Sequence, residues 1–195
     1  MYVKGQPFNV VVDDYIPFQY GGPLFARQGK QNSIWGMMME KVWAKVNGNY
    51  DRTQGGFENE MFDSAGAPTV EYNFDDQNGV NRDEHAVYNI LKDAFGKEYS
   101  MACGINQNAN RDNRGLADGH AYSGHEIKVV NYQGTNTCFI KIRNPHGEDT
   151  WAGAFSDIDS AMDSNLQQEL GHNKDKDDGN FWMTCKDFVH HFKKS

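Results

Sequence analysis

One stretch of the chain, residues 119–157, constrains the fold more than any other, because it contains two strand-like segments separated by a turn. The first runs over residues 120–132, and the second, residues 138–143, alternates apolar and polar side chains with a period of two. A Gln-Gly-Thr-Asn sequence (133–136) between them predicts a β-hairpin. The chain is therefore expected to contain an antiparallel sheet in which every second residue from Cys138 to Ile142 lies on one face.

The same hairpin brings two polar side chains together. His120 falls at the start of the first strand and Asn144 just past the end of the second, and these two ends are neighbours in an antiparallel pair. An asparagine oxygen can accept the imidazole N–H and fix the tautomer and orientation of the ring. The spacing thus predicts an acid–base element, although such a pair taken alone is more often structural.

Three motifs surround these residues: Gly-His120-Ala-Tyr-Ser, Ile-Arg-Asn144-Pro-x-Gly-Glu and Trp-x-Gly-Ala-Phe-Ser-Asp157. Together they closely resemble the second protease-core subdomain of calpains, which are calcium-regulated, papain-like cysteine proteases. Further landmarks in family order lie in residues 10–17, 35–50 and 179–188, so the resemblance spans nearly the whole chain.

The resemblance implies an α+β fold, with a twisted antiparallel sheet or partly open barrel and helices packed outside it. It assigns residues 1–195 to the second subdomain, with 1–17 as the end of, or linker from, a first subdomain that is otherwise absent.

By the same resemblance, His120 is the general base and acid, and Asn144 orients it. The family carries its nucleophile in a Gly-x-Cys-Trp context on a helix of the first subdomain, and none of Cys103, Cys138 and Cys185 has that context. Cys103 and Cys138 lie in apolar strands, where a cysteine is usually inert, while Cys185 beside a helix start is the one chemical rival. We therefore expect half an active site, inactive without a Cys-bearing subdomain as partner, that acts on protein substrates.

One residue departs from the family pattern beside the expected site. His146 stands two residues after Asn144, where the family has a tryptophan that covers the His–Asn hydrogen bond. An imidazole covers less area and is titratable, so we expect weaker shielding of the pair.

The resemblance also implies a calcium site built from two loops. Asp157 and Asp178 keep family carboxylates, and the backbone near Lys176 could supply a carbonyl oxygen, but Thr150 and Asn180 replace glutamates. Because ligand charge is a main control of calcium affinity, the predicted site is weakened. Four neighbouring acids could compensate, or the whole group could simply solvate a surface loop: Asp149, Asp159, Asp175 and Asp177.

Composition narrows the class of protein. The net charge of −8 argues against a nucleic-acid surface, and no run of about 18 apolar residues could form a spanning helix. The N-terminus does not resemble a secretory signal, and three cysteines without metal-ligand spacing leave at least one unpaired, which indicates a reducing compartment. We expect a soluble, cytoplasmic domain.

Periodicity predicts the remaining elements. Strands are expected over residues 8–12, 99–105 and 180–183. A helix is expected over residues 33–46, with Ser33 as its N-cap, Gly48 just past its end, and an apolar stripe, with Trp35 beside it, through Ile34, Met38, Val42 and Val46. A second helix is expected to open at Arg82 or Asp83 and run to residue 95, and a third to follow a Thr184–Asp187 capping box. The segments 55–81, 106–118 and 158–178 are expected to be loops or irregular. Two readings of function stay open: the His/Asn-bearing half of a protease, or a degenerate calpain-like module that binds calcium or a protein without cleaving it. An unrelated β-rich binding domain is the least favoured.

Overall fold

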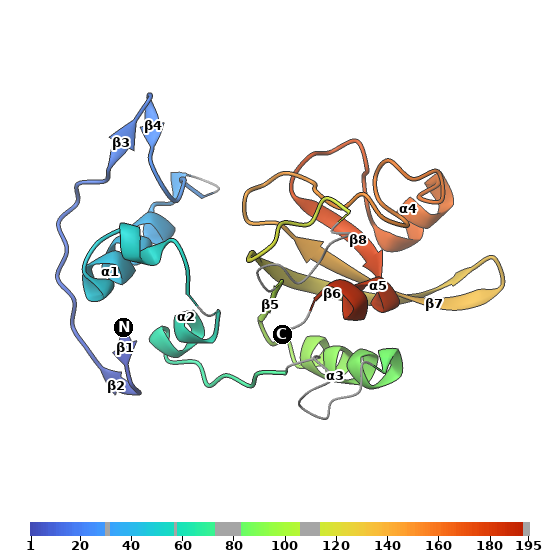
Figure 1. Cartoon of the computed structure of the whole chain (residues 1–195), viewed down its shortest axis with the longest axis horizontal. Coiled ribbons are helices and arrows are strands. Elements are labelled where there is room, and N and C mark those ends of the chain that lie inside the picture. The colour runs from blue at the N-terminus through green and yellow to red at the C-terminus, as the bar shows by residue number, and fades with distance from the viewer. Residues whose placement is uncertain (30–31, 57, 73–82, 106–113, 193–195) are drawn as a thin grey trace. The chain divides into compact units, whose positions relative to one another are not determined.

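The computed structural model describes residues 1–29, 32–56, 58–72, 83–105 and 114–192. The chain divides into two compact units, Met1–Val70 and Glu71–Ser195, which are described one at a time (Figure 1). The expectation that residues 1–195 form one second subdomain, with residues 1–17 as a linker, stays a prediction.

The first unit is built around one helix, α1 (Trp35–Asn47). Two short hairpins precede it, formed by β1 (Tyr2–Val3) with β2 (Gln6–Pro7) and by β3 (Phe18–Gln19) with β4 (Gly22–Pro23). The 3-10 helix η2 (Asp51–Thr53) and α2 (Glu58–Ser64) follow it. The strand expected over residues 8–12 is absent, and α2 lies where we expected a loop.

The expected faces of α1 were wrong. Ser33 does not cap the helix, because Ile34 occupies the cap position without a side-chain bond. Met37 and Ala44 are buried, whereas Trp35, which the sequence placed beside the apolar stripe, is 72% exposed. Gly48 does end the helix, as expected, and its φ of 107° is a conformation that favours glycine.

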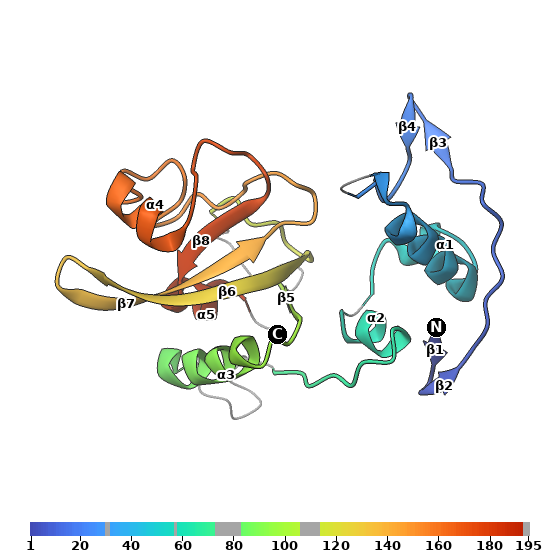
Figure 2. The same cartoon turned by 180° about the vertical axis from the view of Figure 1, so that it is seen from behind.

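The second unit is a four-stranded antiparallel sheet with helices on both faces (Figures 1 and 2). The strands pair in the order β5 (Met101–Gly104), β6 (Ala121–Tyr132), β7 (Thr135–Arg143) and β8 (Asn180–Thr184), and within the described residues they form no closed barrel. The helices are α3 (Glu84–Gly96), α4 (Ser164–Leu170) and α5 (Cys185–His191). The α+β prediction is confirmed, and α4 is a helix that the sequence reading missed.

Strand β7 is buried on both faces. Ile140 and Ile142 are fully buried in a core that includes side chains of α3 and α5, and Phe139 is fully buried on the opposite face with residues of α4. The turn of the hairpin is shorter than expected, because Tyr132 already pairs with Thr135. A central strand thus carries the chain directly to Asn144.

Two predicted helix caps are present. The Asp83 carboxylate accepts a bond from the His85 backbone N–H, and the Thr184 hydroxyl accepts one from Asp187 at 3.0 Å. The predicted loop over residues 106–118 falls largely on residues 106–113, which lie outside the described residues. None of the described helices is both long and apolar enough to cross a membrane.

The cysteines differ from the expectation. Cys138 and Cys185 form a disulfide between β7 and the first residue of α5, with Cα atoms 5.4 Å apart. The register explains why: Phe139 pairs with Thr184, and Cys138 just before Phe139 therefore lies opposite Cys185 just after Thr184. Cys103 is the remaining thiol, and it is buried.

Candidate active site

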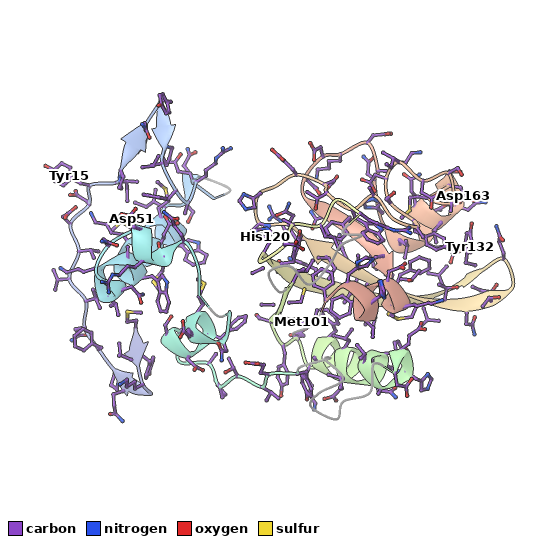
Figure 3. The ribbon with its side chains drawn as sticks, in the orientation of Figure 1. Tyr15, Asp51, Met101, His120, Tyr132 and Asp163 are labelled. Atoms are coloured by element: carbon purple, nitrogen blue, oxygen red, sulfur yellow. A yellow bond between two sulfur atoms is a disulfide. The ribbon has the colours of Figure 1, made fainter. Side chains whose placement is uncertain are left out.

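His120 and Asn144 meet at the end of the sheet opposite the hairpin turn. His120 Nε2 lies 2.9 Å from Asn144 Oδ1, a hydrogen-bond distance. Figure 3 shows His120 at one end of the second unit and Tyr132, beside the turn, at the other. The hairpin therefore brings these two side chains together, as the strand register predicts.

The amide of Asn144 is oriented from both sides by the backbone. Its Nδ2 donates to the carbonyl oxygen of Glu148 at 3.1 Å, and its Oδ1 accepts the backbone N–H of His146 at 3.1 Å. Because nitrogen and oxygen are thereby told apart, the atom facing His120 is an acceptor. His120 must carry its proton on Nε2, which leaves Nδ1 free to accept one.

A tight turn holds Asn144 in place. The Asn144 N–H donates to the carbonyl oxygen of Gly179 at 2.8 Å, and the Gly147 N–H donates to the carbonyl oxygen of Asn144 at 3.0 Å. A Cβ atom at Gly179 would lie 2.7 Å from that same oxygen, so this close approach requires glycine. Asn144 is only 3% exposed. It is held by Gly179, just before β8, as well as by β7.

Two aromatic rings contact His120. The Tyr122 ring meets it edge-on at 4.7 Å between centroids, and the His146 ring lies 4.6 Å away at a tilt of 36°. Tyr122 is buried, its hydroxyl accepts the Ala117 N–H, and burial raises the pKa of its phenol. His146 is exposed to solvent. The His120 imidazole therefore contacts one buried ring, that of Tyr122, and one solvent-exposed ring, that of His146.

No cysteine of the chain is placed to act as the nucleophile. Cys138 and Cys185 are joined to each other, so the expected chemical rival Cys185 has no free thiol. Cys103 is 1% exposed on β5 and its thiol donates to the carbonyl oxygen of Tyr122. The site contains a base and its orienting amide without a thiol.

The second feature is an acidic group, which we define as the side chains of Asp149, Asp157 and Asp177, in the loops that follow β7 and precede β8. The Asp149 N–H donates to Asp177 Oδ1 at 2.8 Å, and Asp157 Oδ1 lies 2.6 Å from His172 Nε2. Asp149 Oδ1 and Asp157 Oδ2 are buried and have no hydrogen-bond partner among the residues that the structure describes. Burial, followed by the charge and hydrogen-bonding proximity of Asp157, raises the pKa of Asp149 to about 6. Carboxylate oxygens are the type of ligand that a hard cation prefers.

Three of the other predicted ligands, Asp178, Lys176 and Asn180, are engaged with one another. Asp178 accepts hydrogen bonds from the Lys176 ammonium at 2.6 Å and from Asn180 Nδ2 at 2.7 Å. Although burial raises the pKa of Asp178, these bonds lower it to about 2. The Thr150 hydroxyl is buried without a hydrogen bond of ordinary geometry, close enough to the Tyr122 phenol to influence its pKa.

Among the described residues, no group of three or more histidine, cysteine, aspartate or glutamate side chains is placed so that it could hold a metal ion. Asp159 serves its own loop, accepting the backbone N–H groups of Phe155 and Ala161. His172 was missed by sequence reasoning, because it lies in a segment expected to be irregular and belongs to no motif. The signal that could have found it is Gly171, which ends α4 in a left-handed conformation and fixes the residue after it.

An α+β domain that presents a paired imidazole and amide at one end of an antiparallel sheet has the arrangement of the papain-like class of cysteine proteases. Sequence comparison agrees, since the pattern that describes the family "Calpain family cysteine protease" matches residues 1–195. The chain belongs to the calpain family.

Three relatives illustrate the similarity. The chain is 34% identical to the calpain-1 catalytic subunits of Bos taurus and Homo sapiens, in each case over 97% of this chain, and 32% identical to calpain-9 of Mus musculus over 95% of it. In each case the match covers 27% of the relative. The chain thus spans about a quarter of the length of the curated relatives it matches.

Proposed function

We propose that this chain supplies the histidine and asparagine of a calpain-type cysteine endopeptidase, and that the nucleophilic cysteine comes from a segment outside it. The single observation that carries the proposal is the bond between His120 and Asn144, with the amide orientation fixed by the backbone. Family membership supports the reaction class, and protein substrates follow from that class.

The proposed chemistry follows from the tautomer of His120. With Nε2–H held by Asn144, Nδ1 accepts the proton of an incoming thiol, so that the sulfur becomes a thiolate and the ring an imidazolium. The thiolate adds to the scissile carbonyl, and the imidazolium gives its proton to the departing amine. His120 then takes a proton from the water that hydrolyses the thioester. Asn144 keeps the ring oriented through all these steps.

The first unit supports docking to a missing segment. Within this unit, large apolar side chains are exposed, among them Trp35 at 72% and Phe18 at 65%. We propose that a Cys-bearing segment outside this chain covers some of them.

We further propose that the acidic group binds calcium. The support is that Asp149 Oδ1 and Asp157 Oδ2 are buried with no hydrogen-bond partner among the described residues, and that carboxylate oxygens are ligands that calcium prefers. Bound calcium would neutralise these charges and tie the loop after Asn144 to the loop before β8. Asp178 would join only after exchanging its Lys176 and Asn180 bonds, so we expect a weakened site.

The experiment is complementation. The chain is co-expressed with the Cys-bearing segment of its gene, and cleavage of a fluorogenic peptide is measured with calcium and with EDTA. We expect no cleavage by the chain alone, calcium-dependent cleavage by the pair, and loss of at least about 10²-fold in His120→Ala. His125→Ala, an exposed histidine on β6, is the matched control. Cleavage that survives His120→Ala contradicts the proposal.

A second candidate is a non-catalytic module that binds calcium or a protein partner. The observations that favour it are the exposed His146 in the place of a covering tryptophan and the engagement of Asp178 by Lys176. A gene that lacks the Gly-x-Cys-Trp stretch upstream would support this module. The cytoplasmic location remains a prediction, and the disulfide weighs against it because disulfides persist mainly in oxidising compartments.

A further inference from the structure

The hydrogen bond to Asn144 does not by itself fix the imidazole of His120. The torsion that turns a histidine ring about its Cβ–Cγ bond has only a broad energy minimum, so the ring can rock while one of its atoms stays in place. The backbone of His120 is held, because its carbonyl oxygen accepts the Ile105 N–H at 3.0 Å. A second contact on the ring itself is therefore needed to set its plane.

Tyr122 supplies such a contact from within the sheet. His120 directly precedes β6 and Tyr122 is the second residue of that strand, and alternate residues of a strand share a face. The two rings meet at 79° with their centroids 4.7 Å apart, an edge-to-face arrangement that aromatic rings prefer. The imidazole cannot turn about its Cβ–Cγ bond without losing this contact or colliding with the tyrosine.

The ring of Tyr122 is itself held by the core. Tyr122 is 1% exposed, and the rings of Phe192 and Phe181 meet it edge-on at 5.4 Å and 6.2 Å between centroids. Its hydroxyl accepts the Ala117 N–H at 2.9 Å. Burial raises the pKa of the phenol, so the side chain stays neutral and acts on His120 without charge. Tyr122 thus presents a fixed surface to the imidazole.

The other ring that contacts His120 has more freedom. The His146 ring lies 4.6 Å from it, but His146 is exposed and can rotate into solvent without opening a cavity. Rotation of Tyr122 would leave a void in a close-packed core, which is costly. Of these two neighbours, Tyr122 is the one expected to control the plane of the imidazole.

We propose that Tyr122 is a positioning residue for His120, whose ring keeps Nε2–H on Asn144 and leaves Nδ1 free to accept a proton. The inference rests on the proposed function, in which Nδ1 takes the proton of an incoming thiol. An edge-to-face ring pair contributes an energy that corresponds to about two- to tenfold in an equilibrium or a rate. Without the tyrosine ring, the imidazole samples planes from which Nδ1 does not reach the thiol, and kcat falls.

The first test needs no enzyme activity. Long-range 1H–15N spectra of the full chain at a pH of about 8, where a histidine is ordinarily neutral, distinguish a protonated ring nitrogen from an unprotonated one. Wild-type His120 should show one of each. Tyr122→Leu should move the two nitrogen shifts toward a common value, because the ring is freed from Asn144 and exchanges tautomers. Tyr122→Phe keeps the ring and should match the wild type.

The matched control for both tests is Phe139→Leu. Phe139 is as buried as Tyr122 and also meets a ring edge-on, that of Phe155 at 5.0 Å, but it belongs to the core cluster on the opposite face of the sheet. Its loss should lower the free energy of unfolding and leave the His120 shifts unchanged. A general loss of stability is thereby separated from a loss of positioning.

The second test uses the complemented enzyme. Tyr122→Leu should lower kcat by about tenfold and leave KM within about twofold, because a buried side chain does not bind substrate. Tyr122→Phe should restore kcat to within about twofold of the wild type. Phe139→Leu should keep the wild-type kcat at a temperature where all the variants are folded.

The inference is overturned by His120 shifts that are the same in the wild type and in folded Tyr122→Leu, or by an unchanged kcat in that variant. If Tyr122→Leu does not fold, Tyr122→Met replaces it, since methionine fills an irregular space without a ring. The wild type also tests the contact: no nuclear Overhauser effect between the His120 and Tyr122 rings overturns the inference.

The inference and the proposed function fail in different ways. Cleavage that Tyr122→Leu leaves unimpaired keeps the proposed function and overturns the role of Tyr122. A complemented pair that never cleaves overturns the proposed function, and the spectra of the chain alone then decide whether Tyr122 positions His120.

Discussion

Removing the charge of Asp149 should stabilise the second unit at alkaline pH. Burial and the neighbouring Asp157 raise the pKa of Asp149 from 3.8 to about 6. The native carboxyl therefore holds its proton more tightly than the unfolded one, and the native state binds more protons between these two pH values. Stability falls as the pH rises through this window, and the full penalty is present above pH 6.

The magnitude follows from the same interval. The pKa of Asp149 rises from 3.8 to about 6, which is roughly 2 pKa units. At about 1.36 kcal/mol per unit, the upper limit of the stability penalty is about 3 kcal/mol. Asp149 is only partly buried, so solvent screening reduces the penalty to about 1–2 kcal/mol. Asp149→Asn has nearly the same shape without the charge. We expect it to gain that amount of unfolding free energy at pH 8 and about half as much at pH 5.

The assay is urea unfolding in EDTA, followed through the NMR resonances of β7 so that the second unit is observed by itself. Asp159→Asn is the matched control, because backbone N–H groups of Ala161 and Phe155 lower the pKa of that carboxyl and its loss should destabilise the protein. A gain in Asp149→Asn that is equal at pH 5 and pH 8, or a loss of stability at pH 8, refutes the reasoning. Saturating calcium should reverse the order of the two proteins, since the variant has lost one of the two carboxylates on which the proposed calcium site rests.

Three further predictions concern other features. Asn144→Ala in the complemented enzyme should lower kcat by about 10²-fold or more with little change in KM, because the amide orients the base and does not bind substrate; an unchanged kcat in a peptide assay contradicts this. Thr184→Ala should cost about 1 kcal/mol in urea unfolding through loss of the α5 cap, and Thr184→Ser should restore most of it. The Cys138–Cys185 disulfide closes a loop of 47 positions, so its reduction should lower the free energy of unfolding by about 4 kcal/mol through chain entropy. The rate of hydrogen exchange in β7 and β8 should rise by about 10³-fold. Cys103→Ala should show the same response to reductant as the wild type.

Sequence patterns predicted the elements whose signals are local and strong. The period-two segment before Arg143 became β7, and the apolar stripe through Val87 and Leu91 became α3, with Asp83, one of the two residues expected to open the helix, at its N-cap. Each of these segments packs the side chains that its periodicity indicates. The proximity of His120 and Asn144 was predicted from their positions at neighbouring strand ends, and the two side chains are in hydrogen-bond contact.

The remaining features depend on tertiary contacts that no local pattern contains. Helix α4 is a short segment of seven residues among acidic loops, and only Leu166 and Leu170 of it are buried, so it gives little periodic signal. The faces of α1 were misassigned because its buried side holds Met37 and Ala44, whereas the longest run of apolar residues at helical spacing passes through Met38 and Val42. The disulfide required knowing that β7 and β8 are neighbours.

The bond from Asn144 Nδ2 to the carbonyl oxygen of Glu148 has a consequence for which residues position 144 can accept. An aspartate would have the same shape and could still accept the imidazole N–H, yet its second oxygen would oppose a carbonyl oxygen across the turn. Two acceptor oxygens at that distance repel each other. Asn144→Asp should therefore open the turn that Gly147 closes, and the loop that follows should be displaced. The turn selects an amide over an acid at this position, independently of any demand made by catalysis.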